Sequence, residues 1–240
     1  MTTSAPRTAR ERVREEMTSE ILAVARDHVA REGAVALSLR SVARDLGMAP
    51  SALYRYFDGR DALLSALILS AYESLAAEAE RVAAEATDET GADAERWKLV
   101  PRAVRAWALA RPHEWGLIFG TPIPGYHAPH DTVVPYARIA DAVVRPLVDA
   151  YRGGRLAPGS RPPTRPVSDA LRSAMAPISD GLFPGVPVER IVLAVDAWTT
   201  LVGAVSLEVF GHWRNTILDP GEYFEALLDD LAATMGLSAG

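Results

Sequence analysis

The chain has 240 residues, of which 49% are hydrophobic and 23% charged, and it contains no cysteine. This length fits one large domain or a small domain joined to a larger one, and the composition excludes a disordered or collagen-like chain. The lack of cysteine excludes disulfides, thiolate zinc sites and cysteine nucleophiles. A reducing compartment is the simplest setting for such a chain, so we expect a cytoplasmic protein.

Positive charge is concentrated at the start of the chain. The formal net charge is −6, yet residues 1–60 contain ten Arg against eight Asp and Glu, which gives +2 there and −8 over the remaining residues. Contacts with phosphate are local at physiological ionic strength, so an acidic protein still binds DNA when its basic groups share one face. The charge distribution therefore permits nucleic acid as a partner without identifying it.

The sequence predicts no membrane segment. Residues 1–14 are polar and lack the apolar stretch of a signal peptide. The longest nearly apolar run, residues 191–207, is interrupted by Asp196 and is shorter than the roughly 20 residues that span a bilayer. We interpret this run as a buried helix.

The spacing of apolar residues predicts an all-α fold. Sustained period-two alternation is missing, whereas apolar residues recur every three to four positions in most segments. Gly33 and Gly47 follow two such segments and are natural helix ends, and Ser38 and Pro50 stand at helix starts. The predicted helices are residues 13–29, 38–46, 50–56, 58–86, 96–110, 114–120, 132–151, 167–178, 188–210 and 222–235.

Residues 38–57 carry the most informative motif. They read SLRSVARDLGMAPSALYRYF, which has the spacing of a helix-turn-helix. Ala43 is small where two helices must cross closely, and Gly47 supplies the tight turn. Leu53 and Phe57 are expected to point inward and to hold the second helix, the recognition helix, on its scaffold.

The outward positions of this helix suit the major groove of DNA. Short side chains let a helix enter the groove, tyrosine hydroxyls reach phosphate oxygens, and an arginine bonds to a guanine edge or to the backbone. The candidate DNA-contacting residues on the helix are Ser51, Ala52, Tyr54, Arg55 and Tyr56.

Residues 18–65 resemble the TetR family of bacterial regulators. The shared pattern is Thr/Ser-x-Arg-x-Ile/Val-Ala, Gly-Val, Leu-Tyr-x-His/Tyr-Phe, and a Lys or Arg before Leu-Leu. The resemblance implies that Arg40 also contacts DNA and that Arg60 contacts phosphate. Met48 and Ala49 depart from the pattern, where Val and a capping Ser are usual. The second change weakens the cap by about 1 kcal/mol, partly offset by Pro50.

Residues 95–235 are similar to one branch of this family, which carries Trp-x-x-x-His-Gly in its penultimate long helix. Here the run begins at Trp198 and ends at Gly203, with Val202 in place of the histidine, so no role of that histidine is transferred. The resemblance implies an α-helical domain for ligand binding and dimerisation. We therefore predict a DNA-binding domain at residues 1–62 and an effector-binding and dimerisation domain at residues 63–240.

Dimerisation is assigned to the last two predicted helices. The helix at 188–210 is apolar on nearly all sides and needs cover on more than one face. The segment from Gly203 to Ser206 favours close approach between helices of two subunits over packing inside one subunit.

Aromatic residues of the second domain are candidates for an effector pocket. They suit an apolar or aromatic ligand, although aromatic residues at helical spacing more often belong to the core. The candidate effector-binding residues are Trp107, Trp115, Phe119, Tyr126 and Trp198.

Two further segments have open interpretations. Residues 1–14 carry four arginines, which suit either a flexible arm reaching the minor groove or a helix extension paired with the interleaved glutamates. His127, His130 and Asp131 are of metal-ligand types, and His113 and Glu114 are further candidate ligands nearby, yet the Pro-rich surroundings favour an ordinary loop.

The sequence thus predicts a homodimeric repressor that binds a palindromic operator in double-stranded DNA and is released by an unidentified small molecule. No cofactor is expected. The alternatives are a metal-responsive regulator of the same fold, or an α-helical enzyme using the C-terminal pocket. Motifs for nucleotide binding, hydrolase nucleophiles and zinc proteases are missing from the sequence, which disfavours the enzyme.

Overall fold

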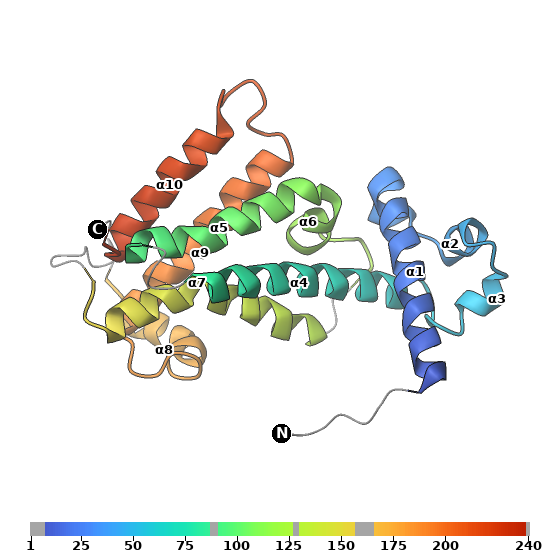
Figure 1. The fold of residues 1–240 in the computed structure, drawn as a ribbon, viewed down its shortest axis with the longest axis horizontal. Coiled ribbons are helices and arrows are strands. Elements are labelled where there is room, and N and C mark those ends of the chain that lie inside the picture. Colours follow the sequence, from blue (N-terminus) through green and yellow to red (C-terminus); the bar gives the residue numbers. More distant parts are fainter. Residues whose placement is uncertain (1–7, 87–90, 127–129, 157–165, 239–240) are drawn as a thin grey trace. The chain divides into compact units, whose positions relative to one another are not determined.

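A computed structural model of the chain describes residues 8–86, 91–126, 130–156 and 166–238 (Figure 1). Every regular element in these four ranges is helical, which confirms the predicted all-α fold. The α-helices are α1 (Ala9–Glu32), α2 (Leu39–Asp45), α3 (Pro50–Leu53), α4 (Arg60–Glu85), α5 (Asp93–Ala110), α6 (Pro112–Phe119), α7 (Val133–Arg152), α8 (Asp169–Ser179), α9 (Val188–Val209) and α10 (Pro220–Met235). Two short 3-10 helices are η1 (Ala34–Ala36) and η3 (His130–Thr132).

The chain forms two compact units. The N-terminal unit comprises residues up to Tyr72 together with His113–Thr132, and the second unit comprises Glu73–Pro112 and Val133 onward. This division differs from the predicted boundary at residues 62/63, because the first half of α4 and the segment containing α6 belong to the N-terminal unit. Apolar side chains of these two segments pack on the N-terminal core, which explains the difference.

The core of the N-terminal unit unites α1, α2, α3 and the start of α4. The apolar stripe of α1 enters this core from Ile21 onward, whereas Val13, predicted on the same stripe, is 60% exposed. Leu117 and Ile118 of α6 pack against its edge. The fully buried members, with no exposed surface, are Ile21, Ala25, Val42, Ala43, Leu53, Leu63 and Leu64.

In the second unit, α5 is the central helix. It lies against α7, α9 and α10, and α8 packs on α9 (Figure 1). The indole of Trp97 on α5 is completely buried and donates a hydrogen bond to the carbonyl oxygen of Val143 on α7, at 3.1 Å. Burial of this large side chain together with its polar N–H joins the two helices.

Two helices are long and apolar enough to cross a membrane by length and composition, namely α4 and α9. In their most apolar windows, 44% and 50% of the residues are buried inside the protein, as in core helices of a folded domain. The predicted burial of the run at 191–207 agrees with this arrangement.

The helix ends show where local expectations fail. Ser38 precedes α2 as predicted, but its side chain makes no capping hydrogen bond. Gly33 has the positive φ expected after α1, at 82°, yet its ψ of 160° lies outside the left-handed helical region. Thr8 and Glu11 form a reciprocal capping box that the sequence analysis missed, so α1 begins at Ala9. Of the two interpretations of residues 1–14, the structure therefore supports the helix extension for residues 9–14.

Candidate DNA-binding surface

The candidate DNA-binding surface is supported by the packing of α2 against α3, where the two helices cross. Ala43 is completely buried where the helices meet, as predicted. Gly47 has φ +65°, which lets the chain turn sharply after α2. The amide of Met48 donates a 2.8 Å hydrogen bond to the carbonyl oxygen of Ala43, and this bond closes the turn.

The recognition segment consists of α3 and the turn that follows it. Regular α-helix ends at Leu53, three residues before the predicted end, but the chain continues as tight turns in which Arg55 and Tyr56 donate to the carbonyl oxygens of Ala52 and Leu53, at 3.2 and 2.9 Å. The side chain of Ala49, the N-cap residue of α3, makes no capping hydrogen bond, because a methyl group cannot accept one.

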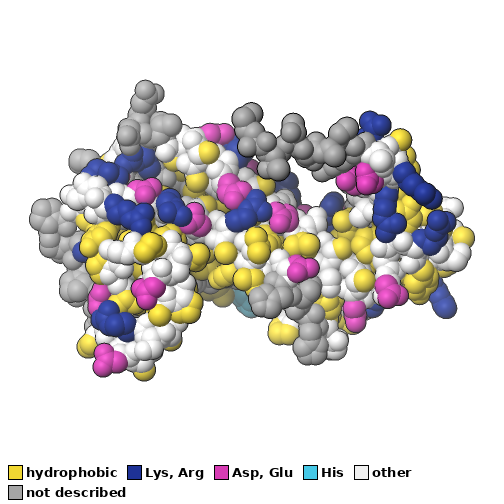
Figure 2. Space-filling model, turned by 90° about the horizontal axis from the view of Figure 1, so that it is seen from below, with side chains coloured by type: hydrophobic (Ala, Val, Ile, Leu, Met, Phe, Trp, Pro, Cys, Tyr) yellow, Lys and Arg dark blue, Asp and Glu magenta, His cyan; other side chains and the backbone are white. Residues whose placement is uncertain are grey.

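The recognition segment separates inward from outward side chains. Leu53 is completely buried and Phe57 is 8% exposed. Ser51, Tyr54 and Arg55 are exposed, and Tyr54 retains 53% of its surface. Ala52 and Tyr56 are partly buried, and Arg40 is exposed on α2. Figure 2 shows basic side chains gathered on the N-terminal unit, at the right of the view.

Arg60 has structural partners that the sequence analysis did not anticipate. Its guanidinium donates hydrogen bonds to the carbonyl oxygens of Leu37, Ala34 and Val35, at 3.2, 3.1 and 3.3 Å. It therefore caps η1 and ties it to the start of α4. Contact of Arg60 with phosphate remains a prediction.

Arg14 reaches the recognition segment from α1. Its Nη2 donates a hydrogen bond to the carbonyl oxygen of Arg55, at 3.4 Å. Its Cζ lies 5.3 Å from the centroid of the Tyr56 ring, within cation–π range. The hydrogen bond links residues 41 positions apart. The arginines near the N-terminus were the sequence signal for these contacts.

A buried histidine joins α1 to α2. His28 is 2% exposed, and its Nε2 lies 2.8 Å from Oδ2 of Asp45. Asp45 is also within 3.6 Å of Arg31 and 3.5 Å of Arg44. The hydrogen bond from His28, followed by its charge and that of Arg44, lowers the pKa of the Asp45 carboxyl despite partial desolvation. This polar cluster holds the helix that precedes the recognition segment.

The five aromatic residues predicted to bind an effector do not lie together. Trp115 is completely buried and its ring centroid is 4.4 Å from that of Phe119, in the N-terminal unit. In the second unit, the indole N–H groups of Trp107 and Trp198 donate to the hydroxyls of Ser74 and Tyr136, at 3.1 and 3.0 Å.

Tyr126 lines a small cavity of about 250 Å³ within the N-terminal unit. Its hydroxyl lies 3.0 Å from that of Ser65. The other lining residues are Ile68, Tyr72, Leu117, Ile118, Gly120, Thr121, Pro122, Ile123 and Thr132.

The metal hypothesis gains no support from the parts of the chain that the structure describes. His127 lies outside the described residues, and for His130 the structure describes only the backbone. Within the described ranges, no group of three His, Cys, Asp or Glu side chains is arranged to hold a metal ion.

Comparison with known proteins agrees with the two-part organisation. Residues 21–67 match the family described as "Bacterial regulatory proteins, tetR family", and residues 97–231 match "Tetracyclin repressor-like, C-terminal domain". The HTH-type transcriptional regulator Rv1816 of Mycobacterium tuberculosis is 39% identical over 233 residues, which cover 92% of this chain and 93% of that protein.

Solved structures show the same fold. The crystal structure of the regulatory protein SCO4313 has a TM-score of 0.75 and 33% sequence identity, covering 95% of this chain and 98% of that one. RolR, solved in complex with resorcinol, has a TM-score of 0.51 and 17% identity, covering 92% of this chain and 89% of that one. The relatives are named as regulators, which argues against the enzyme alternative. The chain therefore belongs to the TetR family of transcriptional regulators.

Proposed function

We propose that this regulator is a homodimeric repressor that binds a palindromic operator and is released by a small molecule in the cytoplasm. The observation that carries the proposal is the recognition segment, which exposes Ser51, Tyr54 and Arg55 while Leu53 and Phe57 anchor it in the core. Proteins with this arrangement insert the exposed side of the helix into the major groove.

The proposed reading surface combines two kinds of contact. Arg55 binds a base edge or a phosphate, and Ser51 and Ala52 are short enough to let the segment approach the groove. The hydroxyls of Tyr54 and Tyr56, with Arg40 and Arg60, bind the DNA backbone and fix the register. The positive charge of residues 1–60 supports these contacts.

The proposed dimer interface is the exposed side of α9 and α10. A symmetric dimer uses the same patch of both subunits, and small side chains let helices approach closely. Leu207 and Phe210, three residues apart at the end of α9, are 43% and 44% exposed, and neighbouring exposed apolar side chains suit an interface. Other exposed residues of this patch are Thr199, Thr200, Gly203 and Tyr223.

In the proposed mechanism, binding of the operator and binding of the effector are coupled through the dimer. Two recognition segments fit successive major grooves about 34 Å apart. An effector that binds more tightly to a form with another spacing or tilt lowers operator affinity by linkage. The complex of RolR with resorcinol shows that a protein of this fold binds a small molecule. The five predicted aromatic residues remain proposed effector contacts.

Selection of bound DNA from a random pool tests the proposal first, and a palindromic consensus is the expected result. Gel shifts with that operator then compare the wild type with Tyr54→Ala and Arg55→Ala, which we expect to lose specific binding while remaining dimeric. Arg172→Ala is the control, because Arg172 is exposed on α8 in an ion pair with Glu189. Unchanged affinity of both recognition-segment variants would refute the proposed reading surface.

A further inference from the structure

The Tyr126 cavity is built from the first half of α4, from α6 and from the segment that follows α6. All of its lining residues belong to the N-terminal unit, which also carries the recognition segment. Its volume is about 250 Å³. A cavity of about 150 Å³ already admits a benzene ring, so this one has room for a single ring with a substituent.

The wall of this cavity is mostly apolar. Ile68 of α4 is 4% exposed, and Leu117, Ile118 and Ile123 are half-buried. Among the described residues, none with a charged side chain lines the cavity. The removal of a charge from water is costly unless an opposite charge compensates it, so the wall favours an uncharged ligand.

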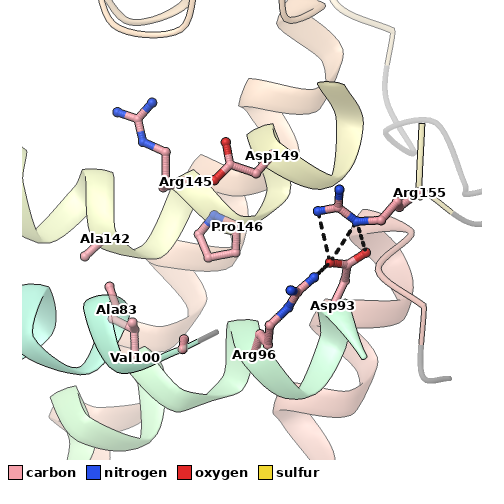
Figure 3. A pocket seen from close by; sticks show the side chains of 10 residues that line it. Ala83, Asp93, Arg96, Val100, Ala142, Arg145, Pro146, Asp149 and Arg155 are labelled. Carbon is pink, nitrogen blue, oxygen red and sulfur yellow. Dashed lines mark hydrogen bonds and ion pairs between the residues drawn. The ribbon is translucent and has the colours of Figure 1, made fainter. Parts of the chain in front are cut away.

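A cavity of about 210 Å³ in the second unit is of a different kind, because its charged side chains already bind one another (Figure 3). Asp93 accepts hydrogen bonds from Arg96 and Arg155. Arg145 pairs with Asp141 on α7, and Figure 3 shows it turned away from the other two arginines. Three guanidinium groups thus balance three carboxylates, those of Asp93, Asp141 and Asp149. This cavity selects no ligand charge.

Hydroxyl groups supply the polar contacts at the Tyr126 cavity. The hydroxyl oxygen of Tyr126 lies 3.0 Å from that of Ser65 on α4, so one of these groups donates to the other. Each hydroxyl has one hydrogen and two lone pairs, and the pair therefore retains one hydrogen to donate and lone pairs to accept with. A ligand hydroxyl, which also donates and accepts, matches this pair.

Aromatic rings support one side of the cavity. The Tyr72 hydroxyl donates a 3.2 Å hydrogen bond to the carbonyl oxygen of Ile118, which ties α4 to α6. The Tyr72 ring meets that of Phe119 nearly at right angles, with 6.2 Å between centroids, and Trp115 packs on Phe119. Three of the five aromatic candidates, Trp115, Phe119 and Tyr126, thus belong to this region of the N-terminal unit.

We propose that the Tyr126 cavity is the effector site and that the effector is a small uncharged molecule with one apolar ring and a hydroxyl group. The hydroxyl binds to the pair of Ser65 and Tyr126. The ring lies against Leu117, Ile118 and Ile123. This inference rests on the proposed function, because it names the chemical class of the molecule that releases the operator.

The cavity and the recognition segment share one core. Leu117, Ile118 and Ile123 pack against the buried cluster that contains Leu53 of α3. In addition, α4 begins at Arg60, directly after the recognition segment. Protein cores are closely packed and transmit strain, so a ligand that separates α6 from α4 also shifts the support of Leu53. An effector that prefers this form lowers operator affinity by linkage.

Calorimetric titration with phenol, benzyl alcohol and cyclohexanol tests the site. We expect at least one of these alcohols to bind the wild type. The charged analogues benzoate and benzylamine are expected not to bind, because the cavity offers no opposite charge. The site is refuted if none of the three alcohols binds, or if the charged analogues bind as tightly as the alcohols.

Tyr126→Phe removes the hydroxyl and keeps the ring. It is expected to weaken alcohol binding about 3- to 10-fold, since one hydrogen bond is lost. Toluene, which has no hydroxyl, is expected to respond equally to the variant and the wild type. Tyr151→Phe is the matched control, because Tyr151 is a half-buried tyrosine on α7 in the second unit, and it is expected to bind alcohols like the wild type.

A second variant fills the cavity without removing a polar group. Ile123→Trp is expected to melt near the wild-type Tm and to bind none of the alcohols. If it melts much lower, the comparison of Tyr126→Phe with Tyr151→Phe decides alone. Alcohol binding at wild-type strength by both Tyr126→Phe and a folded Ile123→Trp would refute the site.

The operator measurement separates the two proposals. Fluorescence anisotropy with the selected operator is expected to show weaker DNA binding when the bound alcohol is present. Alcohol binding without any change in operator affinity would refute the effector role of the cavity. Failure of the unliganded protein to bind any operator would instead refute the proposed function, while the titrations still judge whether the cavity binds alcohols.

Discussion

Arg14 on α1 and Arg55 in the recognition segment are joined by a hydrogen bond of 3.4 Å from the Arg14 guanidinium to the Arg55 carbonyl oxygen. The same guanidinium lies 5.3 Å from the ring centroid of Tyr56. Carbonyl groups at the end of a helix lack partners within the helix, so Arg14 satisfies one and fixes the end of the short recognition segment. The start of α1 is therefore a support for the surface proposed to read DNA.

Arg14→Ala is expected to raise the operator Kd about 5- to 30-fold, because each of the two contacts contributes about 0.5–1 kcal/mol and about 1.4 kcal/mol corresponds to a factor of ten. Gel shifts on the selected operator measure this, and circular dichroism checks that helix content is unchanged. Arg12→Ala removes the same charge two residues earlier, on another side of α1, and is expected to change affinity less. Full recovery of affinity by Arg14→Lys would show that charge alone matters and would contradict the positioning role.

Ion pairs on α5 and α4 are expected to differ strongly in strength. Arg105 and Glu208 form a double hydrogen bond at 2.7 and 2.6 Å with side chains only 23% and 11% exposed. Arg105→Ala is therefore expected to lower the free energy of unfolding by about 2 kcal/mol. Arg81→Ala breaks the surface pairs of Arg81 with Glu78 and Glu85 on α4, where the Arg81 side chain is 52% exposed, and is expected to cost much less than Arg105→Ala.

Urea denaturation at one protein concentration measures both variants, since the stability of a dimer depends on concentration. Equal losses in the two variants would mean that burial does not govern the strength of these pairs.

Asp93 is expected to make stability depend on pH in the acid range. Hydrogen bonds from Arg155 and Arg96 hold the pKa of Asp93 below its usual value although burial opposes them. The folded state is therefore favoured above the ordinary Asp pKa of about 3.9, and this contribution is lost as the pH falls toward the folded pKa.

Asp93→Asn is expected to be less stable than the wild type by about 1–3 kcal/mol at pH 7, and the difference is expected to close as the pH falls below about 4. Unfolding curves between pH 7 and pH 2.5 measure it. The neighbouring charged residues Arg145 and Asp149, which line a cavity together with Asp93, are unchanged in the variant, so the two proteins differ only at residue 93. A constant difference across this range would show that the carboxylate charge is not the cause.

Leu207→Glu is expected to convert the proposed dimer into monomers at micromolar concentration. Leu207 is 43% exposed on α9, and a charge buried in an apolar interface without a partner is strongly unfavourable. Size-exclusion chromatography with light scattering gives the mass directly. Leu218→Glu is the control, because Leu218 is 99% exposed in the segment before α10. Equal masses for Leu207→Glu and the wild type would place the interface elsewhere.

The sequence by itself determined the helices and the helix-turn-helix. Apolar spacing identifies a helix face, and a turn such as that at Gly47 needs a residue that tolerates positive φ, so both depend on neighbours in the chain. The same local logic correctly placed Leu53 and Phe57 inside and Tyr54 and Arg55 outside.

The tertiary structure alone decided which distant side chains meet. It separated the five candidate aromatic residues between two units, bonded Arg60 to the carbonyl oxygens of η1, and gathered Arg96, Arg145 and Arg155 at one cavity. A helix pattern tells which side of a helix is buried but not which helix covers it or in what register. Contacts across 62 residues, such as that of Arg155 with Asp93, depend on packing of the whole unit and leave no local periodicity to detect.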